Sequence, residues 1–70
     1  MKIVRIRKSD RETYGLVQNG KVATKYDITY ATAVPIPINL RDFLFDGWLE
    51  EIKENFEKIP FDHELYEFEV

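Results

Sequence analysis

The stretch TYGLVQNGKVATKY, residues 13–26, decides the fold of this 70-residue chain. Two runs of β-forming residues, 13–18 and 21–26, flank Asn19-Gly20. That dipeptide is the strongest short-range signal for a two-residue hairpin, because a type I′ turn needs positive φ at both central residues. The stretch therefore predicts two antiparallel strands joined by a tight turn.

A two-residue turn also sets the register of the two strands. The predicted pairs are Gln18–Lys21, Leu16–Ala23 and Tyr14–Lys25. Leu16 and Ala23 then share one face of the sheet, because side chains alternate along a strand. Val17 and Val22 share the other face. Gly15 interrupts the second strand and indicates either a slightly weaker strand or a close approach of another backbone segment.

On either side of the hairpin the chain is predicted to be extended. Residues 2–7, KIVRIR, alternate β-branched and charged side chains, which predicts a strand with one solvated face. Residues 8–12 break this pattern and are typical of a turn. Residues 27–38 are predicted to be an extended connection without a helix. Pro35 and Pro37 remove two backbone donors there and disfavour the helical conformation of the residues before them.

Two helices are predicted in the second half of the chain. A short one covers residues 40–45, with Asn39 as its N-cap. Its apolar side consists of Leu40, Phe43 and Leu44. An amphipathic helix covers residues 48–58, with Asp46 as its cap and Pro60 beyond its end. Its apolar stripe consists of Trp48, Ile52, Phe56 and Ile59, with Leu49 beside it.

Residues 65–70 alternate apolar side chains with glutamates, which predicts a C-terminal strand. The pattern continues to the last residue, which is typical of a domain that belongs to a longer protein. The fold class predicted from all these segments is α+β. We expect a small antiparallel β-meander of three strands plus a C-terminal strand, with one or two short helices packed on it, in a single domain over residues 1–70.

Composition limits the class of protein. Seventy residues form one domain at most. The chain has no cysteine, which excludes a disulfide framework and a thiolate metal site. Its longest apolar stretch is far below the roughly 20 residues of a membrane span, and its N-terminus lacks the apolar core of a signal peptide. We therefore expect no membrane partner and a cytoplasmic location.

Charge is distributed unevenly. Residues 1–30 carry seven Lys or Arg and three Asp or Glu, whereas residues 31–70 carry three and ten. The early cations are Lys2, Arg5, Arg7, Lys8, Arg11, Lys21 and Lys25. They could neutralise the phosphates of a nucleic acid, but they also fit the solvated face of a sheet, and the pI is near 5.0. We do not expect a nucleic-acid partner. The opposite charges of the two halves can also attract each other within the fold.

No set of residues has the pattern of a catalytic or metal site. Most of the thirteen acidic residues occupy positions expected to be solvated. Asp62-His63-Glu64 is the cluster with acid–base potential, but no nearby Ser, Cys or second His accompanies it. The three glycines are too far apart for a phosphate-binding loop. We predict no catalytic, cofactor-binding or metal-ligating residue in this chain.

The second half of the chain is rich in aromatic residues. A domain of this size can hardly bury all seven, and an exposed aromatic patch is typical of an interface. The candidate interface residues are Phe45, Trp48, Phe61, Tyr66 and Phe68.

The order of these segments resembles the N-terminal region of shorter members of the fumarylacetoacetate hydrolase family. The opening MKIVRIRKSDRETYGLVQNGKV is similar to the strand and YG-containing hairpin with which those members begin. LRDFL is similar to a segment with a short helix, and ELYEFEV to the strand that leads into their catalytic body. The resemblance implies a Mg²⁺-dependent parent enzyme that acts on 2-oxo acid or β-diketone substrates by hydrolysis, decarboxylation or isomerisation. It places the metal ligands and catalytic residues in a domain after residue 70, so no functional residue is carried over to this chain.

The resemblance thus implies a non-catalytic N-terminal domain that serves packing, assembly or covering of the active site. Its partner would be the catalytic domain of the same polypeptide or a second copy in a homo-oligomer. Two alternatives stay open. One is a free-standing interaction module that uses an aromatic helix face, and the other is a small nucleic-acid-binding β-hairpin protein.

Overall fold

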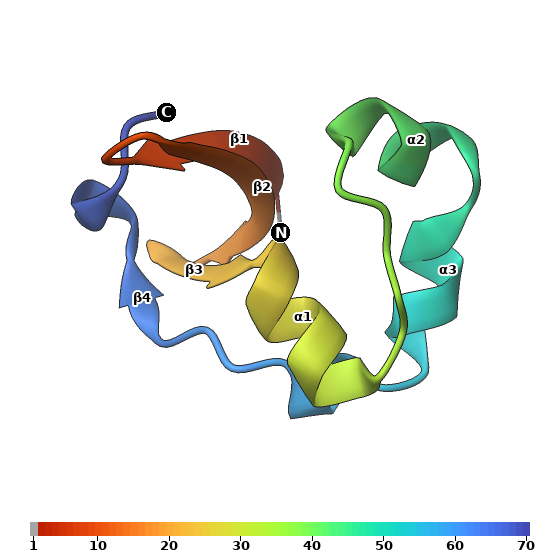
Figure 1. Cartoon of the computed structure of the whole chain (residues 1–70). Helices are drawn as coiled ribbons and strands as arrows, with labels where there is room; N and C mark the ends of the chain where they lie inside the picture. The colour runs from red at the N-terminus through yellow and green to blue at the C-terminus, as the bar shows by residue number, and fades with distance from the viewer. Residues whose placement is uncertain (1) are drawn as a thin grey trace.

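The chain forms a curled antiparallel sheet flanked by short helices (Figure 1). The computed structural model describes residues 2–70. Its elements, in chain order, are β1 (Lys2–Lys8), β2 (Arg11–Gln18), β3 (Lys21–Thr24), α1 (Lys25–Thr32), α2 (Leu40–Phe45), α3 (Trp48–Lys53), the 3-10 helix η1 (Phe56–Lys58), β4 (His63–Glu64) and the 3-10 helix η2 (Leu65–Glu67). Neighbouring strands in the order β1-β2-β3-β4 pair antiparallel. The predicted α+β class, a small meander with short helices, is confirmed.

The hairpin at Asn19-Gly20 forms as predicted. Both turn residues have positive φ, 54° and 77°, as a type I′ turn requires. The pairs across β2 and β3 are Gln18–Lys21, Val17–Val22, Leu16–Ala23 and Gly15–Thr24. The predicted pair of Tyr14 with Lys25 is wrong, because β3 ends one residue earlier and Lys25 begins α1.

Gly15 marks a close approach of β2 and β3. A Cβ atom at this position would lie 2.5 Å from the carbonyl oxygen of Ala23, much closer than a carbon atom can approach. Glycine in the interior of a strand allows this approach and helps a sheet to bend sharply. Of the two sequence interpretations of Gly15, the close backbone approach is therefore the one that the structure supports.

The sheet buries side chains on both of its faces. The face towards the helices contributes to the main core, which consists of Tyr14, Leu16, Ala23, Ile28, Ile36, Phe43, Ile52 and Ile59. Val22 neighbours Ala23 along β3 and therefore points to the opposite face, inside the curl. Ile6 lies on that inner face as well, and Val22 and Ile6 are 0% and 1% exposed respectively. The molecule thus has an outer core under the helices and a smaller inner core within the sheet.

The C-terminal residues close the curl. Glu69 forms an isolated antiparallel bridge with Arg7 of β1, and each backbone N–H donates to the carbonyl of the other residue at 2.8 Å. At the other edge of the sheet, β4 pairs with β3. Residues 63–69 therefore join the two edges of the sheet, and Figure 1 shows the C-terminus beside β1.

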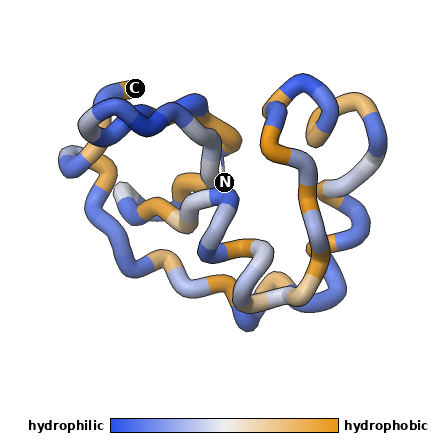
Figure 2. Tube along the Cα trace, viewed as in Figure 1, coloured by the Kyte–Doolittle hydropathy of each residue, from blue (hydrophilic) through white to orange (hydrophobic). Residues whose placement is uncertain are grey.

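Tyr14 ties the sheet to the connection between α1 and α2. Its hydroxyl donates a hydrogen bond to the carbonyl of Pro37 at 2.5 Å, and its ring lies 5.1 Å from that of Phe43. Burial raises the pKa of Tyr14 to about 12. Figure 2 shows much of this connection as hydrophobic, and Ile36 within it is 2% exposed. The connection is thus packed into the core.

Helix α1 shows that two predictions were wrong. The third strand does not reach residue 26, and residues 27–38 are not free of helix. A capping box explains the start of the helix. The backbone N–H of Asp27 donates to the Thr24 hydroxyl at 3.2 Å, and the backbone N–H of Thr24 donates to the Asp27 carboxylate at 3.0 Å. The helix ends at Thr32, before either proline is reached, and its C-cap Ala33 has a left-handed φ of 60°.

The predicted helix over residues 48–58 is also wrong in its extent. It ends at Lys53, because Asn55 leaves the helical region with φ −118° and ψ 22°, and η1 follows. Its N-cap is Gly47, with φ 73° and no side-chain hydrogen bond, so Asp46 is not the cap. The short helix over 40–45 is confirmed, with the Asn39 side chain accepting from the Arg41 backbone N–H at 2.8 Å. None of the helices within residues 2–70 is long and apolar enough to cross a membrane.

The predicted strand over residues 65–70 is reduced to the single bridge at Glu69. The regular strand pairing in this region involves β4 instead. Residues 65–67 form η2, because the backbone N–H of Glu64 donates to the Glu67 carboxylate at 2.8 Å and starts a tight turn. The alternation of apolar and acidic residues is real, but the turn removes most of these residues from the sheet.

We expect Gly15→Ala to lower the free energy of unfolding by roughly 1–3 kcal/mol, the usual cost of an extra methyl group in a packed site. The added Cβ would have to displace a backbone carbonyl, which cannot move aside as a flexible side chain can. Urea unfolding measures the loss, with Thr13→Ala on the same strand as the control. A Gly15→Ala variant as stable as the parent would contradict the close approach of β2 and β3.

Candidate interaction surface

The five aromatic residues predicted to form an interface lie in different parts of the fold. Phe45, at the end of α2, is 77% exposed, and Tyr66, in η2, is 84% exposed. Trp48, Phe61 and Phe68 are half-buried. In Figure 1, α2 and the dark-blue turn of η2 stand on opposite sides of the molecule. The structure therefore does not bring these five side chains into one patch.

The three half-buried aromatics stabilise the fold. Trp48 and Phe61 pack against the main core, and the ring of Phe61 lies 5.8 Å from that of Phe56. Phe68 lies on the inner side of the sheet, with its ring edge-on to His63 at 5.8 Å. Replacing any of these three side chains would therefore destabilise the fold, so such variants are unsuited to a test of binding.

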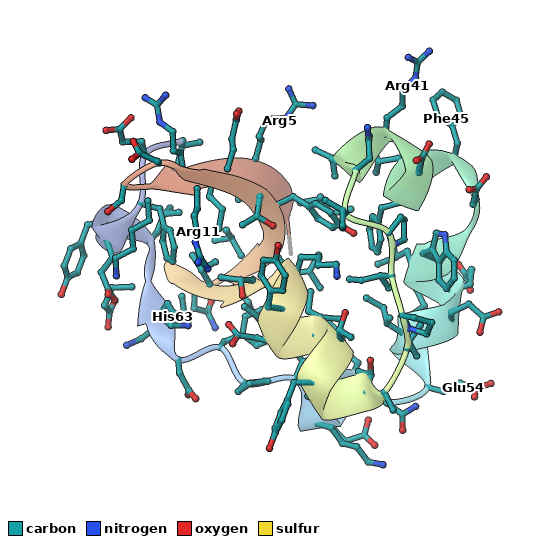
Figure 3. The ribbon with its side chains drawn as sticks, viewed as in Figure 1. Arg5, Arg11, Arg41, Phe45, Glu54 and His63 are labelled. Atoms are coloured by element: carbon teal, nitrogen blue, oxygen red, sulfur yellow. The ribbon has the colours of Figure 1, made fainter. Side chains whose placement is uncertain are left out.

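Helix α2 and Ile38, just before its N-cap, carry exposed apolar side chains. Ile38, Leu44 and Phe45 are 76%, 58% and 77% exposed. The guanidinium of Arg41 lies 5.9 Å from the centre of the Phe45 ring, and Figure 3 shows both side chains extending away from the molecule. These four residues are called the α2 surface below. Exposed apolar side chains beside an arginine are typical of the composition of a protein interface.

Sequence reasoning identified only one member of the α2 surface as an interface residue. Leu44 was expected on the apolar side of its helix, but α2 buries only Phe43. Ile38 lies two residues after the buried Ile36 in an extended segment, and nothing in the local pattern distinguishes the two. Their exposure follows from the position of α2 at the edge of the core.

The basic first half and the acidic second half attract each other directly. The ion pairs between them are Arg7–Glu69, Lys8–Glu67 at 3.5 Å, and Lys21–Glu64. All three join the sheet to the segment that closes it. The two oppositely charged halves of the chain therefore do attract each other within the fold, as the sequence allowed. Three of the seven early cations, Arg7, Lys8 and Lys21, thus have anionic partners within the fold.

These contacts shift the pKa values of the groups involved. A hydrogen bond to the Glu69 carboxylate raises the pKa of Arg7, and one to Glu64 raises the pKa of Lys21. The backbone N–H of Glu64 lowers the pKa of Glu67, and the ammonium of Lys8 lowers it further. Each shift favours the charged form of its group, as a compensated ion pair should.

His63 is paired with a distant residue and not with its sequence neighbours. Its Nε2 atom lies 3.2 Å from the Asp27 carboxylate, which also accepts the capping hydrogen bond from Thr24. The contact joins β4 to the start of α1. No three His, Asp or Glu side chains gather in a metal-binding group anywhere in residues 2–70.

A hollow of about 690 Å³ opens beside the β1–β2 turn. Its charged and aromatic lining consists of Lys8, Arg11, Asp10, Glu12, Tyr26 and Phe68. Two cations are thus offset by two carboxylates, so the charges of the wall select neither an anion nor a cation. Ser9, Thr13 and Thr24 add hydroxyl groups to the same lining.

No protein-family model matches this sequence, and neither does any curated protein or solved structure. The resemblance to the fumarylacetoacetate hydrolase family therefore stays a prediction.

We expect Glu67→Gln to reduce stability at neutral pH and to make stability less sensitive to acid. Since the pKa of Glu67 is lowered in the folded protein, its stabilising effect is present above its ordinary pKa of 4.5 and is lost as the pH falls below it. Urea midpoints should differ between parent and variant near neutral pH and converge in strong acid. Glu57→Gln, on the exposed η1, is the matched control. A constant difference between parent and variant at every pH would show that the Glu67 charge does not stabilise the fold.

Proposed function

We propose that this chain is the non-catalytic N-terminal domain of a cytoplasmic enzyme of the fumarylacetoacetate hydrolase family, and that it packs against the catalytic domain of the same polypeptide. Support comes from the order of strand, hairpin, short helix and terminal acidic–apolar segment in the sequence. The absence of cysteine from the chain is compatible with a reducing compartment.

The observation that carries this proposal is the exposure of the α2 surface. Three of its side chains, Ile38, Leu44 and Phe45, are each more than half exposed although the domain has a core to receive them. Covering a side chain of this size stabilises a complex by about 1.5–3 kcal/mol. The ion pairs and half-buried aromatics already have partners within the domain, whereas the α2 surface does not.

The proposal predicts that the chain binds a catalytic domain through α2. The probe is the catalytic body of a fumarylacetoacetate hydrolase family enzyme expressed without its own N-terminal segment. Sedimentation velocity should show the two co-sedimenting, and Phe45→Ser should weaken the complex by about tenfold or more, as the loss of a buried Phe implies. Tyr30→Ser is the matched control, because Tyr30 is 93% exposed on α1, away from this surface.

Three results would contradict the proposal. The first is no co-sedimentation at any concentration, and the second is equal weakening by the Phe45 and Tyr30 substitutions. The third is Mg²⁺-dependent turnover of an acylpyruvate by the isolated chain, since the proposal assigns catalysis to another domain. Self-association through α2 without binding to a catalytic body would favour the free-standing interaction module instead.

A further inference from the structure

The outer edge of β1 is paired at only one position. Arg7 exchanges both of its backbone hydrogen bonds with Glu69, so its N–H and C=O point away from β2. In an antiparallel strand, residues two and four positions along point these groups in the same direction. Those residues are Arg5 and Ile3, and no backbone partner joins their outward groups in the part of the chain that the structure describes. Such an edge is a template for a further strand.

Two hollows beside this edge leave room for that strand. One, of about 260 Å³, lies where the bridge to Glu69 ends, and its lining includes Arg5, Ile6, Arg7, Glu69 and Val70. The other, of about 550 Å³, lies on the inner side of the sheet. Its apolar lining residues are Val4, Val17, Leu65 and Val70, its polar ones are Lys2, Gln18 and Asn19, and Gly20 completes the lining. Part of the wall next to Val4 is therefore apolar, and the ring of strands is incomplete at this point.

The charge along the edge indicates what would bind there. Arg5 and Arg7 point to the same face, because they are alternate residues of one strand. The Arg7 guanidinium binds the carboxylate of Glu69, the residue opposite it. Arg5 is exposed, extends away from the sheet in Figure 3, and has no ion-pair partner within residues 2–70. A strand in the same register would satisfy Arg5 with an acidic residue.

We propose that the edge of β1 from Ile3 to Arg5 binds an extended segment of a partner polypeptide by antiparallel strand addition. The segment carries an acidic side chain opposite Arg5 and an apolar side chain opposite Val4, over the inner hollow. Backbone hydrogen bonds supply affinity in this mode of recognition, and the alternating side chains supply specificity. This surface is separate from α2, and the proposal does not depend on the assignment to an enzyme family.

A second copy of this chain is a poor occupant of the edge. Antiparallel pairing of two β1 strands over Ile3 to Arg5 would bring the unpaired Arg5 of both copies onto one face of the joined sheet, close to each other. Like charges that face each other across strands are destabilising. The edge therefore favours a partner of opposite charge.

The test uses short capped peptides that alternate Val and Thr and differ at one position. The Glu peptide carries Glu opposite Arg5, and the Lys peptide carries Lys there. The Pro peptide carries Pro at the same position, which removes the N–H that would be donated to the Arg5 carbonyl. Titration into the ¹⁵N-labelled chain should shift the amide signals of Ile3 and Arg5. The Glu peptide should bind about tenfold more tightly than the Lys peptide, since the cross-strand contact changes from attraction to repulsion. The Pro peptide should not bind, because it lacks a ladder donor.

Charge reversal in the chain provides the matching arm. Arg5→Glu should invert the preference, so that the Lys peptide binds more tightly than the Glu peptide. Arg11→Glu is the matched control, because Arg11 is also exposed and lies on β2 at the far end of the hairpin. Arg11→Glu should leave the preference of the parent chain unchanged. The comparison of the three peptides on the parent chain stands even if a variant fails to fold.

Several outcomes would overturn the proposal. Equal binding of the Glu and Lys peptides would show that Arg5 does not select the partner. Binding of the Pro peptide, or amide shifts centred on α2 and not on β1, would show that the strand edge is not the site. Dimerisation of the chain through β1 in the absence of peptide would make a second copy the occupant.

Discussion

Two backbone hydrogen bonds between Arg7 and Glu69 join residues 62 positions apart, and they turn a curled sheet into a ring. Without them, β1 and β4 would be separate edges, and the inner core of Ile6 and Val22 would lose the segment that covers it. The ion pairs between the sheet and the C-terminal acids all lie along this closing segment. Exposed ion pairs of this kind contribute little individually.

The curl that makes closure possible arises locally. Two tight turns connect β1, β2 and β3. Because Gly15 has no side chain, the backbones of β2 and β3 can lie close together at this point, and the sheet can bend there. The helices then cover the outer face, and the C-terminal segment covers the inner one. This division packs most of the aromatic side chains within the domain. The α2 surface and the free part of the β1 edge are two places where apolar or backbone groups lack partners within residues 2–70, and the two proposals rest on them.

Sequence reasoning succeeded where the signal is local. The Asn19-Gly20 turn defines its hairpin with no help from the rest of the chain. It failed at α1 because the two later prolines were given more weight than the capping box of Thr24 and Asp27, which is readable as T-x-x-D and marks a helix start. The candidate interface was only partly predictable, because an aromatic residue such as Phe68 looks the same in sequence whether it packs inside a closed ring or faces a partner. That distinction depends on the bridge at Glu69, a contact between the two ends of the chain.

Amide hydrogen exchange of the free chain tests ring closure most directly, because it measures each backbone hydrogen bond separately. The structure predicts that the amides of Arg7 and Glu69 exchange much more slowly than those of Ile3 and Arg5, which face outward from the same edge without a partner. Exchange at Arg7 and Glu69 as fast as at Ile3 and Arg5 would mean that the ring is open in solution, and it would contradict the closing role of the Arg7–Glu69 bridge.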